Sequence, residues 1–440
     1  MSRELDRVLH YHEQTKHSFN AFARGPDYLD WATQPDPFRR YDGARLLHLD
    51  HIPPDEGPSY DEAFSRGSIT PAPFNRRTVS QLFYDSLALS AWKQAGPTRW
   101  SLRVNPSSGN LHPTEGYLIC GPIEGLCEAP TVCHYVPKEH SLEVRAEFPI
   151  ATWNVMSAGL PQGAFFIGLT SIHWREAWKY GERAYRYCQL DVGHAIAAVA
   201  VAASGMGWQA TLLDGIGSEQ LVHLFGISAP EDAEAEHPDC LLAIYPSSER
   251  LNDFELPGEI TDTFSALSWN GSPNRLSPDH REWEIIDDVA EAARKPPTRG
   301  IYERPPQQAE LIRTDQGTLP LRRIIHQRRS AQAMDGRTAL SRDTFYRILQ
   351  KSIAGPERAP FTTLPWQPSV HLVLFVHRVT GLDPGLYLLV RNTEQDEMLR
   401  SEMNPKFLWK QPEGTPPGMK LFLLAGGDLC LEVGDVRIRT

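Results

Sequence analysis

The sequence feature that most constrains the fold of this chain is an internal repeat. The segments 82–90 (LFYDSLALS) and 344–352 (TFYRILQKS) share a Phe-Tyr pair, a leucine and a serine, with equivalent positions 262 residues apart. After each segment come an apolar strand, a Gly-Leu turn and a tyrosine-bearing strand. In the first copy these elements lie at 116–120, at 125–126 and near Tyr135. In the second copy they lie at 370–375, at 381–382 and near Tyr387. This repeated order of elements predicts an internally duplicated fold.

The two copies are expected to lie in separate domains. We predict a first domain with an N-terminal extension at 1–250, a linker with one helix at 251–306 and a second, incomplete copy at 307–440. The linker is rich in Ser, Pro, Asn and Gly, which favour turns and loops. Within it, apolar residues recur at helical spacing over 283–293, and this spacing predicts a helix that packs on a neighbour.

Apolar patterns in the two copies indicate an α+β fold. Continuous apolar runs predict buried strands, and longer aromatic-rich or alanine-rich runs predict helices. The strands are expected at 163–169, 208–213, 240–245 and 420–425, and the helices at 175–187 and 190–206. We therefore expect helices packed around a central mixed or antiparallel sheet. No counterpart of the alanine-rich helix follows the last strand, so the second copy is expected to be the shorter one.

Composition and charge exclude several classes of protein. The formal net charge is −11 and no lysine- and arginine-rich block offsets it, which argues against a nucleic-acid partner. The longest apolar stretch, 195–203, is too short to cross a membrane, and residues 1–7 lack the apolar core of a secretion signal. The six cysteines show neither CxxC pairs nor zinc spacing. We expect a cytoplasmic protein with free thiols and no metal site.

A short basic signature, Arg328-Arg329-Ser330, occurs once and follows an apolar helix expected at 321–327. Two guanidinium groups and a hydroxyl within one turn suit a phosphate, because guanidinium forks match its oxygens in pairs. The alternative is a solvated basic helix end, in which arginines complement the helix dipole.

A second signature, NPSSGN from Asn105 to Asn110, also occurs once, just before a strand expected from Thr114. Its proline fixes φ, its serines are small and its glycine is permissive, so its backbone can approach a flat ligand closely. The alternative is a turn that feeds the strand. Neither signature contains a glycine-rich nucleotide loop such as GxGxxG or GxxxxGK[ST], and the rest of the chain lacks these motifs as well.

Lys179 and Tyr180 stand side by side on the aromatic helix. A desolvated lysine can lose its proton near neutral pH, and a tyrosine can donate or relay one. The alternative is a helix with an aromatic core face and a solvated charged face. Further along, Asp191 to His194 is expected to cap the next helix, with His194 a satisfied buried residue and no base.

Taken together, these residues resemble the FMN-dependent nitroreductase superfamily. Two segments, NPSSGNLHPTEGY at 105–117 and KYGERAYRYCQLDVGH at 179–194, are similar to its SagB/ThcOx-type dehydrogenase branch. The segments at 11–18 and 34–38 are similar to members in which two copies are fused, and the resemblance covers about residues 10 to 400. Such a protein has two nitroreductase folds that form an intimate pseudo-dimer with FMN at their interface.

The resemblance assigns a role to each signature. Arg328 and Ser330, with Arg329, are expected to bind the FMN phosphate. Four residues of the loop are expected to line the isoalloxazine, and Arg103 is expected to be a lesser contact. These four residues are Pro106, Ser107, Ser108 and Asn110. In azoline-oxidising members an adjacent Lys-Tyr pair takes part in proton removal, which implies Lys179 as base and Tyr180 as its assistant.

The two signatures differ between the copies. The repeat offset places Arg66-Gly67-Ser68 opposite Arg328-Arg329-Ser330, and the second copy has only Pro368-Ser369 in place of the loop. One complete version of each signature predicts a single composite site at the seam between the copies.

The leading hypothesis for function is therefore a flavin-dependent oxidoreductase that transfers hydride between a substrate carbon and flavin N5. Its substrate would be a peptide heterocycle or a small molecule such as a nitroaromatic or a quinone. One alternative is an NAD(P)H-dependent nitro or quinone reductase. Another is a degenerate relative that serves as a non-catalytic scaffold. None of these hypotheses decides whether the chain forms a further oligomer.

Overall fold

The computed structural model describes residues 2–18, 21–64, 67–227, 232–249, 251, 253–301, 319–355 and 359–427. The chain divides into two compact units. The first comprises residues 1–302 and 318–328, and the second comprises 303–317 and 329–440. Arg66, Cys430 and the end of the expected linker (302–306) lie outside the described residues. The domain boundaries drawn from the sequence stay a prediction.

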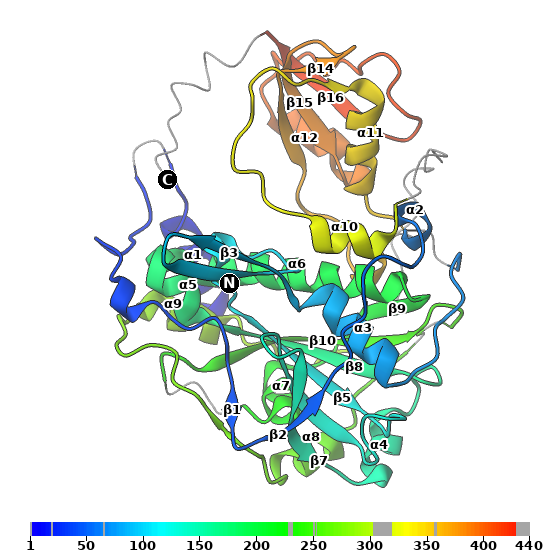
Figure 1. Cartoon of the computed structure of the whole chain (residues 1–440). Helices are drawn as coiled ribbons and strands as arrows, with labels where there is room; N and C mark the ends of the chain where they lie inside the picture. Colours follow the sequence, from blue (N-terminus) through cyan, green and yellow to red (C-terminus); the bar gives the residue numbers. More distant parts are fainter. Residues whose placement is uncertain are drawn as a thin grey trace. The chain divides into compact units, whose positions relative to one another are not determined.

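The first unit is built on a seven-stranded sheet in which all neighbouring strands are antiparallel (Figure 1). Across the sheet the order is β2 (Arg45–His48), β7 (Ser141–Glu147), β6 (Thr131–Val136), β5 (Thr114–Cys120), β8 (Phe165–Ile172), β10 (Glu236–Pro246) and β9 (Trp208–Leu212). Every residue of β5, β6 and β8 is buried, so their apolar runs do not alternate with polar residues. The α+β class and the strands expected in this unit are confirmed.

Helices cover both faces of this sheet. Successive side chains of a strand point to opposite faces. On one face, strand residues such as Tyr117, Phe166 and Leu241 share a core with α4 (Ile150–Met156), α7 (Ser218–Phe225) and α8 (Gly258–Ser265). On the other face, α6 (Ala184–Ser204) packs on β5, β8 and β9 and against α3 (Arg76–Ser86).

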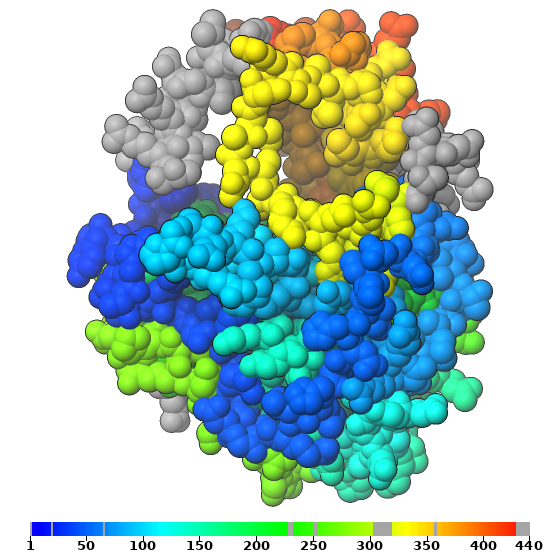
Figure 2. Space-filling view, in the orientation of Figure 1, coloured from blue at the N-terminus to red at the C-terminus, as the bar shows by residue number. Residues whose placement is uncertain are grey.

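A hairpin leads from the first helix of the repeat to the loop before β5. It consists of β3 (Leu89–Ala95) and β4 (Thr98–Arg103), which pair with each other and not with the large sheet. The hairpin lies on the surface of the unit (light blue in Figure 2), where Trp92 is 43% exposed. The loop that follows contains η2 (Ser108–Asn110) and is held at one end by the hairpin and at the other by β5.

The aromatic helix expected at 175–187 is broken into two pieces. α5 (His173–Tyr180) ends at Gly181, whose φ of 55° lies in the region that glycine tolerates best, and η3 (Gly181–Arg183) leads into α6. The expectation for Asp191–His194 was wrong, because α6 begins at Ala184, so these residues lie inside the helix and do not cap it. His194 is exposed.

The N-terminal region and residues 251–301 of the expected linker belong to the first unit. They contribute α1 (Arg3–Gln14), η1 (Trp31–Thr33), α2 (Tyr60–Ala63), α9 (Glu284–Ala292) and the short pair β1 (Tyr41–Asp42) and β11 (Ser272–Pro273). The helix expected at 283–293 is therefore confirmed as α9, which packs against α1 and α6. One helix was expected in the linker, but its described residues form two, because α8 lies there in addition to α9.

A segment distant in sequence completes this unit. α10 (Leu321–Gln327) confirms the helix expected there, and Arg322 and His326 on it bond to the buried carboxylate of Asp85 in α3, at 2.6 and 2.9 Å. The same Arg322 donates to the carbonyls of Ile52 and Pro53. A guanidinium with three acceptors fixes the helix in place.

The second unit contains a smaller sheet with helices on both faces. Its antiparallel order is β13 (Leu372–Val376), β15 (Gly385–Val390) and β16 (Lys420–Gly426). Its other elements are α11 (Arg342–Lys351), η4 (Phe361–Thr363), η5 (Thr393–Gln395), α12 (Asp396–Glu402) and the parallel pair β12 (Leu340–Ser341) and β14 (Val379–Thr380). Tyr346 and Leu349 of α11 pack on one face of the sheet, and Leu399 of α12 packs on the other.

The elements named by the repeat are present in each unit. α3 precedes the antiparallel pair β5 and β6 in the first unit, and α11 precedes the antiparallel pair β13 and β15 in the second. This order matches the repeat, and duplication itself stays a prediction. Among the described residues, no helix combines the length and the apolar character that crossing a membrane requires.

Candidate active site

The side chains of the loop before β5 bond to main-chain groups and to one another. Ser107 Oγ accepts the amide of His112 at 2.8 Å, and the Asn110 amide donates to the carbonyl of Ser101 at 2.9 Å. Burial lowers the pKa of His112 well below its usual range, so the ring is neutral and its Nε2–H donates to Asn110 Oδ1. Gly109 and Asn110 both have positive φ. The loop therefore presents main chain rather than free side chains to a ligand.

A carboxylate on α6 fixes the middle of this loop. Asp191 accepts the Ser108 amide at 3.0 Å and the Ser108 hydroxyl at 2.9 Å. Asp191 is buried, with 1% of its side chain exposed. Bonds to a charged acceptor are about twice as strong as neutral ones, so this contact sets the position of the loop over the helix.

Lys179 and Tyr180 reach the same loop from α5. A Cβ built on Gly109 would lie 2.7 Å from Tyr180 Oη and 3.0 Å from Lys179 Nζ. Both side chains are half-buried. The glycine of the loop signature therefore lies in contact with both members of the Lys-Tyr pair, and only a residue without a side chain leaves them this room.

The N-terminal helix holds the turn that follows Tyr180. Tyr11 of α1 donates to the carbonyl of Glu182 at 2.8 Å and accepts the amide of Arg186 at 3.2 Å. Arg186 also donates to Thr15 Oγ1, and Arg183 donates to the Thr15 carbonyl. The segment at 11–18, part of the family resemblance, is therefore a brace for the end of α5.

Burial dominates the electrostatics beneath the loop. It raises the pKa of Tyr180 to about 12, with a further rise from the charges of Glu176, Tyr187 and Asp191. It also raises the pKa of Glu176 well above its usual range, and Asp191 adds to the rise. Tyr180 therefore carries its proton at neutral pH and can act as a hydrogen-bond donor.

Arg103 is a structural residue in this geometry. Its guanidinium is buried and donates to the carbonyls of Thr114 and Pro37. Burial lowers its pKa to about 10. The contact with a cofactor that the resemblance implies for Arg103 stays a prediction.

Arg328 lies close to the start of the loop, within the first unit. It is the residue after α10, is exposed, and donates from Nη2 to the carbonyl of Val104 at 3.3 Å. Arg329 and Ser330 are also exposed but belong to the second unit. Their expected role in phosphate binding, like that of Arg328, stays a prediction.

Several buried polar atoms around the loop have no hydrogen-bond partner among the described residues, and the side-chain oxygen of Asn105 is one of them. Asn105 is 2% exposed, and its side-chain oxygen accepts no hydrogen bond from the described residues. Because buried polar atoms are nearly always paired, such an atom marks a place where a ligand donor fits. An orphaned acceptor next to a main-chain loop, the tight space over Gly109 and a nearby arginine are consistent with a flat, phosphorylated ligand such as FMN.

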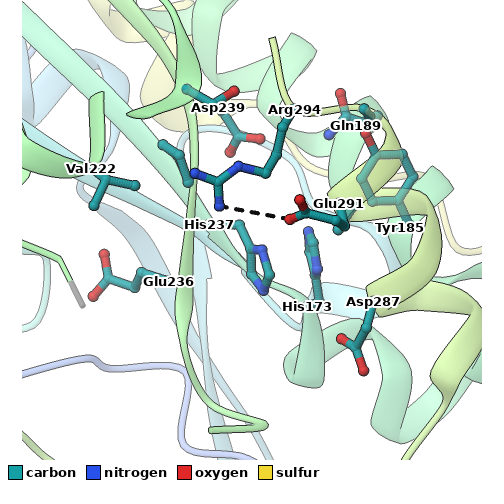
Figure 3. A pocket seen from close by; sticks show the side chains of 14 residues that line it. His173, Tyr185, Gln189, Val222, Glu236, His237, Asp239, Asp287, Glu291 and Arg294 are labelled. Carbon is teal, nitrogen blue, oxygen red and sulfur yellow. Dashed lines mark ion pairs between the residues drawn. The ribbon is translucent and has the colours of Figure 1, made fainter. Parts of the chain in front are cut away.

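A cleft of about 280 Å³ lies between α6, α7 and α9 (Figure 3). The imidazole rings of His173 and His237 stack in it, with their centroids 3.9 Å apart. Burial lowers the pKa of both histidines, and that of His237 falls to about 4. Gln189, which lines this cleft, precedes Asp191 by two residues, so the two side chains point roughly 200° apart around α6. The cleft is therefore distinct from the loop and the Lys-Tyr pair.

A comparison with protein families matches part of the chain. Residues 88–244 match the model of the nitroreductase family. This part of the chain is a nitroreductase-family domain. It contains the loop, Lys179, Tyr180 and Asp191, whereas Arg328-Arg329-Ser330 lies beyond it. No curated protein matches the chain in sequence.

One solved structure shows the same fold. The chain is similar to a protein described as a nitroreductase from Anabaena variabilis, with a TM-score of 0.59 and 20% identity over 90% of this chain and 81% of the other. A second such protein, from Ralstonia eutropha, gives a TM-score of 0.34 and 13% identity over 50% of this chain and 97% of its own. The E. coli microcin synthetase McbBCD complex, with truncated pro-MccB17 bound, gives a TM-score of 0.32 and 16% identity over 54% of this chain and 79% of the other. The fold of this chain is nitroreductase-like.

The sequence did not reveal two residues of this site. Asp191 and Glu176 are single acidic residues within helices, and no spacing in the sequence connects them to the loop. A buried position on α5 for Glu176 is visible only through its aromatic neighbours Trp174 and Trp178, which are also buried.

Proposed function

We propose that this protein is an FMN-dependent oxidoreductase of the SagB/ThcOx type, acting on a peptide or a small molecule. One observation carries the proposal. Gly109 of the loop lies against both Tyr180 Oη and Lys179 Nζ, so the main-chain platform and the proton-transfer pair occupy one place. A flavin reaction that removes hydrogen from carbon needs both: a surface for the ring and a group that takes the proton.

The residues of the chain divide the work as follows. The loop from Pro106 to Asn110 supports a flat ring with its main chain, and Asn105 offers the unpaired side-chain acceptor. Arg328, placed by α10, supplies the positive charge for a phosphate. When bound, FMN supplies the hydride acceptor or donor. Lys179 Nζ, reacting as the uncharged amine, takes the substrate proton and becomes an ammonium, and Tyr180 Oη, which stays protonated, donates a hydrogen bond beside it.

Purified protein tests the cofactor directly. We expect a yellow protein with flavin absorbance between about 350 and 500 nm, or a colourless one that takes up added FMN. The double change Arg328→Ala and Ser330→Ala should weaken FMN binding, whereas Arg323→Ala, an exposed arginine on the same helix, should not. A protein that binds no FMN under either condition would contradict the proposal.

Turnover tests the pair. Lys179→Ala and Tyr180→Phe should keep flavin bound and lower turnover, by roughly 10²-fold or more for the lysine, because positioned acid-base groups contribute 10² to 10⁴. The assay measures oxidation of azoline peptides and reduction of quinones and nitroaromatics. Lys138→Ala and Tyr28→Phe, exposed residues of the same unit, are the controls. Unchanged turnover in both active-site variants would remove the pair from the mechanism.

A further inference from the structure

Two carboxyl groups meet beneath the loop. Glu176 of α5 has no exposed side-chain surface and Asp191 of α6 has 1%, and the two groups are within hydrogen-bonding reach of each other. Two carboxylates cannot donate to each other, so their contact is a hydrogen bond only when one carries a proton. At this depth two negative charges side by side would be strongly unfavourable.

The surrounding donors decide which group holds the proton. Burial raises the pKa of Asp191, and the bonds that it accepts from Ser107 and Ser108 oppose this rise by stabilising its charge. Neither oxygen of Glu176 has a donor among the described residues. Burial, followed by the charge of Asp191, raises the pKa of Glu176 well above its usual range, and the opposing charge of Lys179 does not offset this. The proton therefore belongs to Glu176.

The position of this pair connects it to the candidate site. Glu176 precedes Lys179 by one helical turn, and Asp191 holds Ser108, the residue next to Gly109. We propose that Glu176 and Asp191 share one proton, so that the pair carries a single negative charge on Asp191, and that the pair is a positioning device which keeps the loop on Lys179 and Tyr180. As a role in catalysis, this inference rests on the proposed function; the shared proton itself does not.

All titratable groups around the pair bear on its proton. Lys179 and Tyr180 face it from α5, and Cys188 and Tyr187 lie near it on α6, with His194 close to Asp191. The loop contributes only the hydroxyls of Ser107 and Ser108. Lys179 is the lysine of α5 whose charge opposes the rise in the pKa of Glu176.

Infrared spectroscopy of the full chain at neutral pH detects the proton. The wild type should show the C=O stretch of a protonated carboxylic acid that is absent from Glu176→Gln and retained in Glu284→Gln, an exposed position on α9. In Asp191→Asn this band should disappear at a lower pH than in the wild type, because the neighbouring charge is gone. Identical spectra for the wild type and Glu176→Gln would overturn the shared proton.

The dependence of stability on pH provides a second readout. A carboxyl whose pKa is higher in the folded state than in the unfolded state destabilises the fold as the pH rises above the unfolded-state pKa. This loss continues until the pH passes the folded-state pKa. Glutamine cannot ionise and its amide can donate to Asp191. Glu176→Gln should therefore gain stability relative to the wild type as the pH rises above the unfolded-state pKa of about 4.5. A difference that does not change with pH would contradict the proposal.

The link to catalysis is tested separately. In the wild type, flavin-dependent turnover should fall at high pH, as the pair loses its proton. Glu176→Gln should not show this fall, and the substitution should change kcat more than KM. An unchanged pH profile, together with the infrared band, would overturn the positioning role. A protein without flavin or turnover would sink the proposed function, while the infrared and stability results would still decide the shared proton.

Discussion

The carboxylate of Asp191 holds both the amide and the hydroxyl of Ser108, at 3.0 and 2.9 Å, although the two residues are 83 positions apart. Ser108 lies in the loop before β5 and Asp191 lies in the middle of α6. The helix that covers the sheet therefore also sets the conformation of the loop. A change on α6 that removes this acceptor acts on the candidate site without touching a ligand.

Ser108→Ala removes the hydroxyl bond and keeps the amide bond. Because hydrogen bonds to charged groups contribute about 1.5–3 kcal/mol, we expect a loss of about 1.5 kcal/mol in the free energy of unfolding of the first unit. Urea unfolding followed by hydrogen exchange of the loop measures it. Ser265→Ala, at an exposed hydroxyl on α8, is the control and should change little. Equal losses in the two variants would mean that Asp191 does not hold Ser108.

Gly109→Ala separates backbone strain from the clash with Lys179 and Tyr180. Gly109 has φ of 59° and Gly96 in the β3–β4 turn has 57°, and a Cβ at Gly96 meets nothing within 4 Å. Each substitution should cost about 1–2 kcal/mol for the left-handed backbone. Only Gly109→Ala should also displace the pair and lower turnover at least tenfold. Equal activities of the two variants would contradict the packing of the pair on the loop.

Asp85→Asn should loosen α10, because the change leaves the charge of Arg322 buried without its counter-ion. Breaking one side of a buried pair costs about 3–5 kcal/mol. Hydrogen exchange of α3 and α10 and proteolysis after residue 319 measure the effect. Arg323→Ala on the exposed face of the same helix should leave both unchanged. Normal protection of α10 in Asp85→Asn would show that the ion pair does not anchor it.

His134 predicts a loss of stability at alkaline pH. It lies between Glu115 and Glu143, at 3.0 Å from each; burial lowers its pKa, but these hydrogen bonds outweigh burial and raise the pKa to about 9. A raised histidine pKa stabilises the fold fully below the unfolded value near 6.5, and this contribution is lost as pH rises to about 9. The loss is about 3 kcal/mol.

Thermal unfolding between pH 6 and 10 measures this slope. His134→Gln should flatten it, because glutamine has no proton to lose in this range. His10→Gln, at an exposed histidine on α1, should keep the slope of the wild type. A wild-type slope in His134→Gln would place the titrating group elsewhere in the fold.

Much of the fold was predictable, because local patterns determine it. The apolar runs that predicted β8, β9 and β10 are buried on both faces, so composition alone marks them. Periodicity also placed α9 and α10. It failed at Gly181, where one glycine with positive φ divides an otherwise continuous helical pattern, because the pattern does not report backbone dihedrals.

The site was less predictable from residues alone. Lys179 and Tyr180 were connected to the loop only through the family resemblance, since Tyr180 follows Asn110, the end of the loop, by 70 positions and no spacing rule spans a sheet. Asp191 and Glu176 depend on which faces of α5 and α6 meet beneath the loop, and this is a property of tertiary packing. The inward orientation of the Arg103 guanidinium, onto the carbonyls of Thr114 and Pro37, is likewise a property of tertiary packing that the sequence does not show.

The attachment of α10 to Asp85 has a consequence for synthesis of the chain. Domains generally fold as they leave the ribosome, beginning with the N-terminal one. Asp85 is made early, but Arg322 and His326 follow it by 237 and 241 residues. The first unit can therefore reach its final state only after most of the chain has been translated. Until then, the carboxylate of Asp85 has neither Arg322 nor His326 as a partner. A nascent chain stopped before residue 319 should be the form that chaperones and proteases engage most strongly.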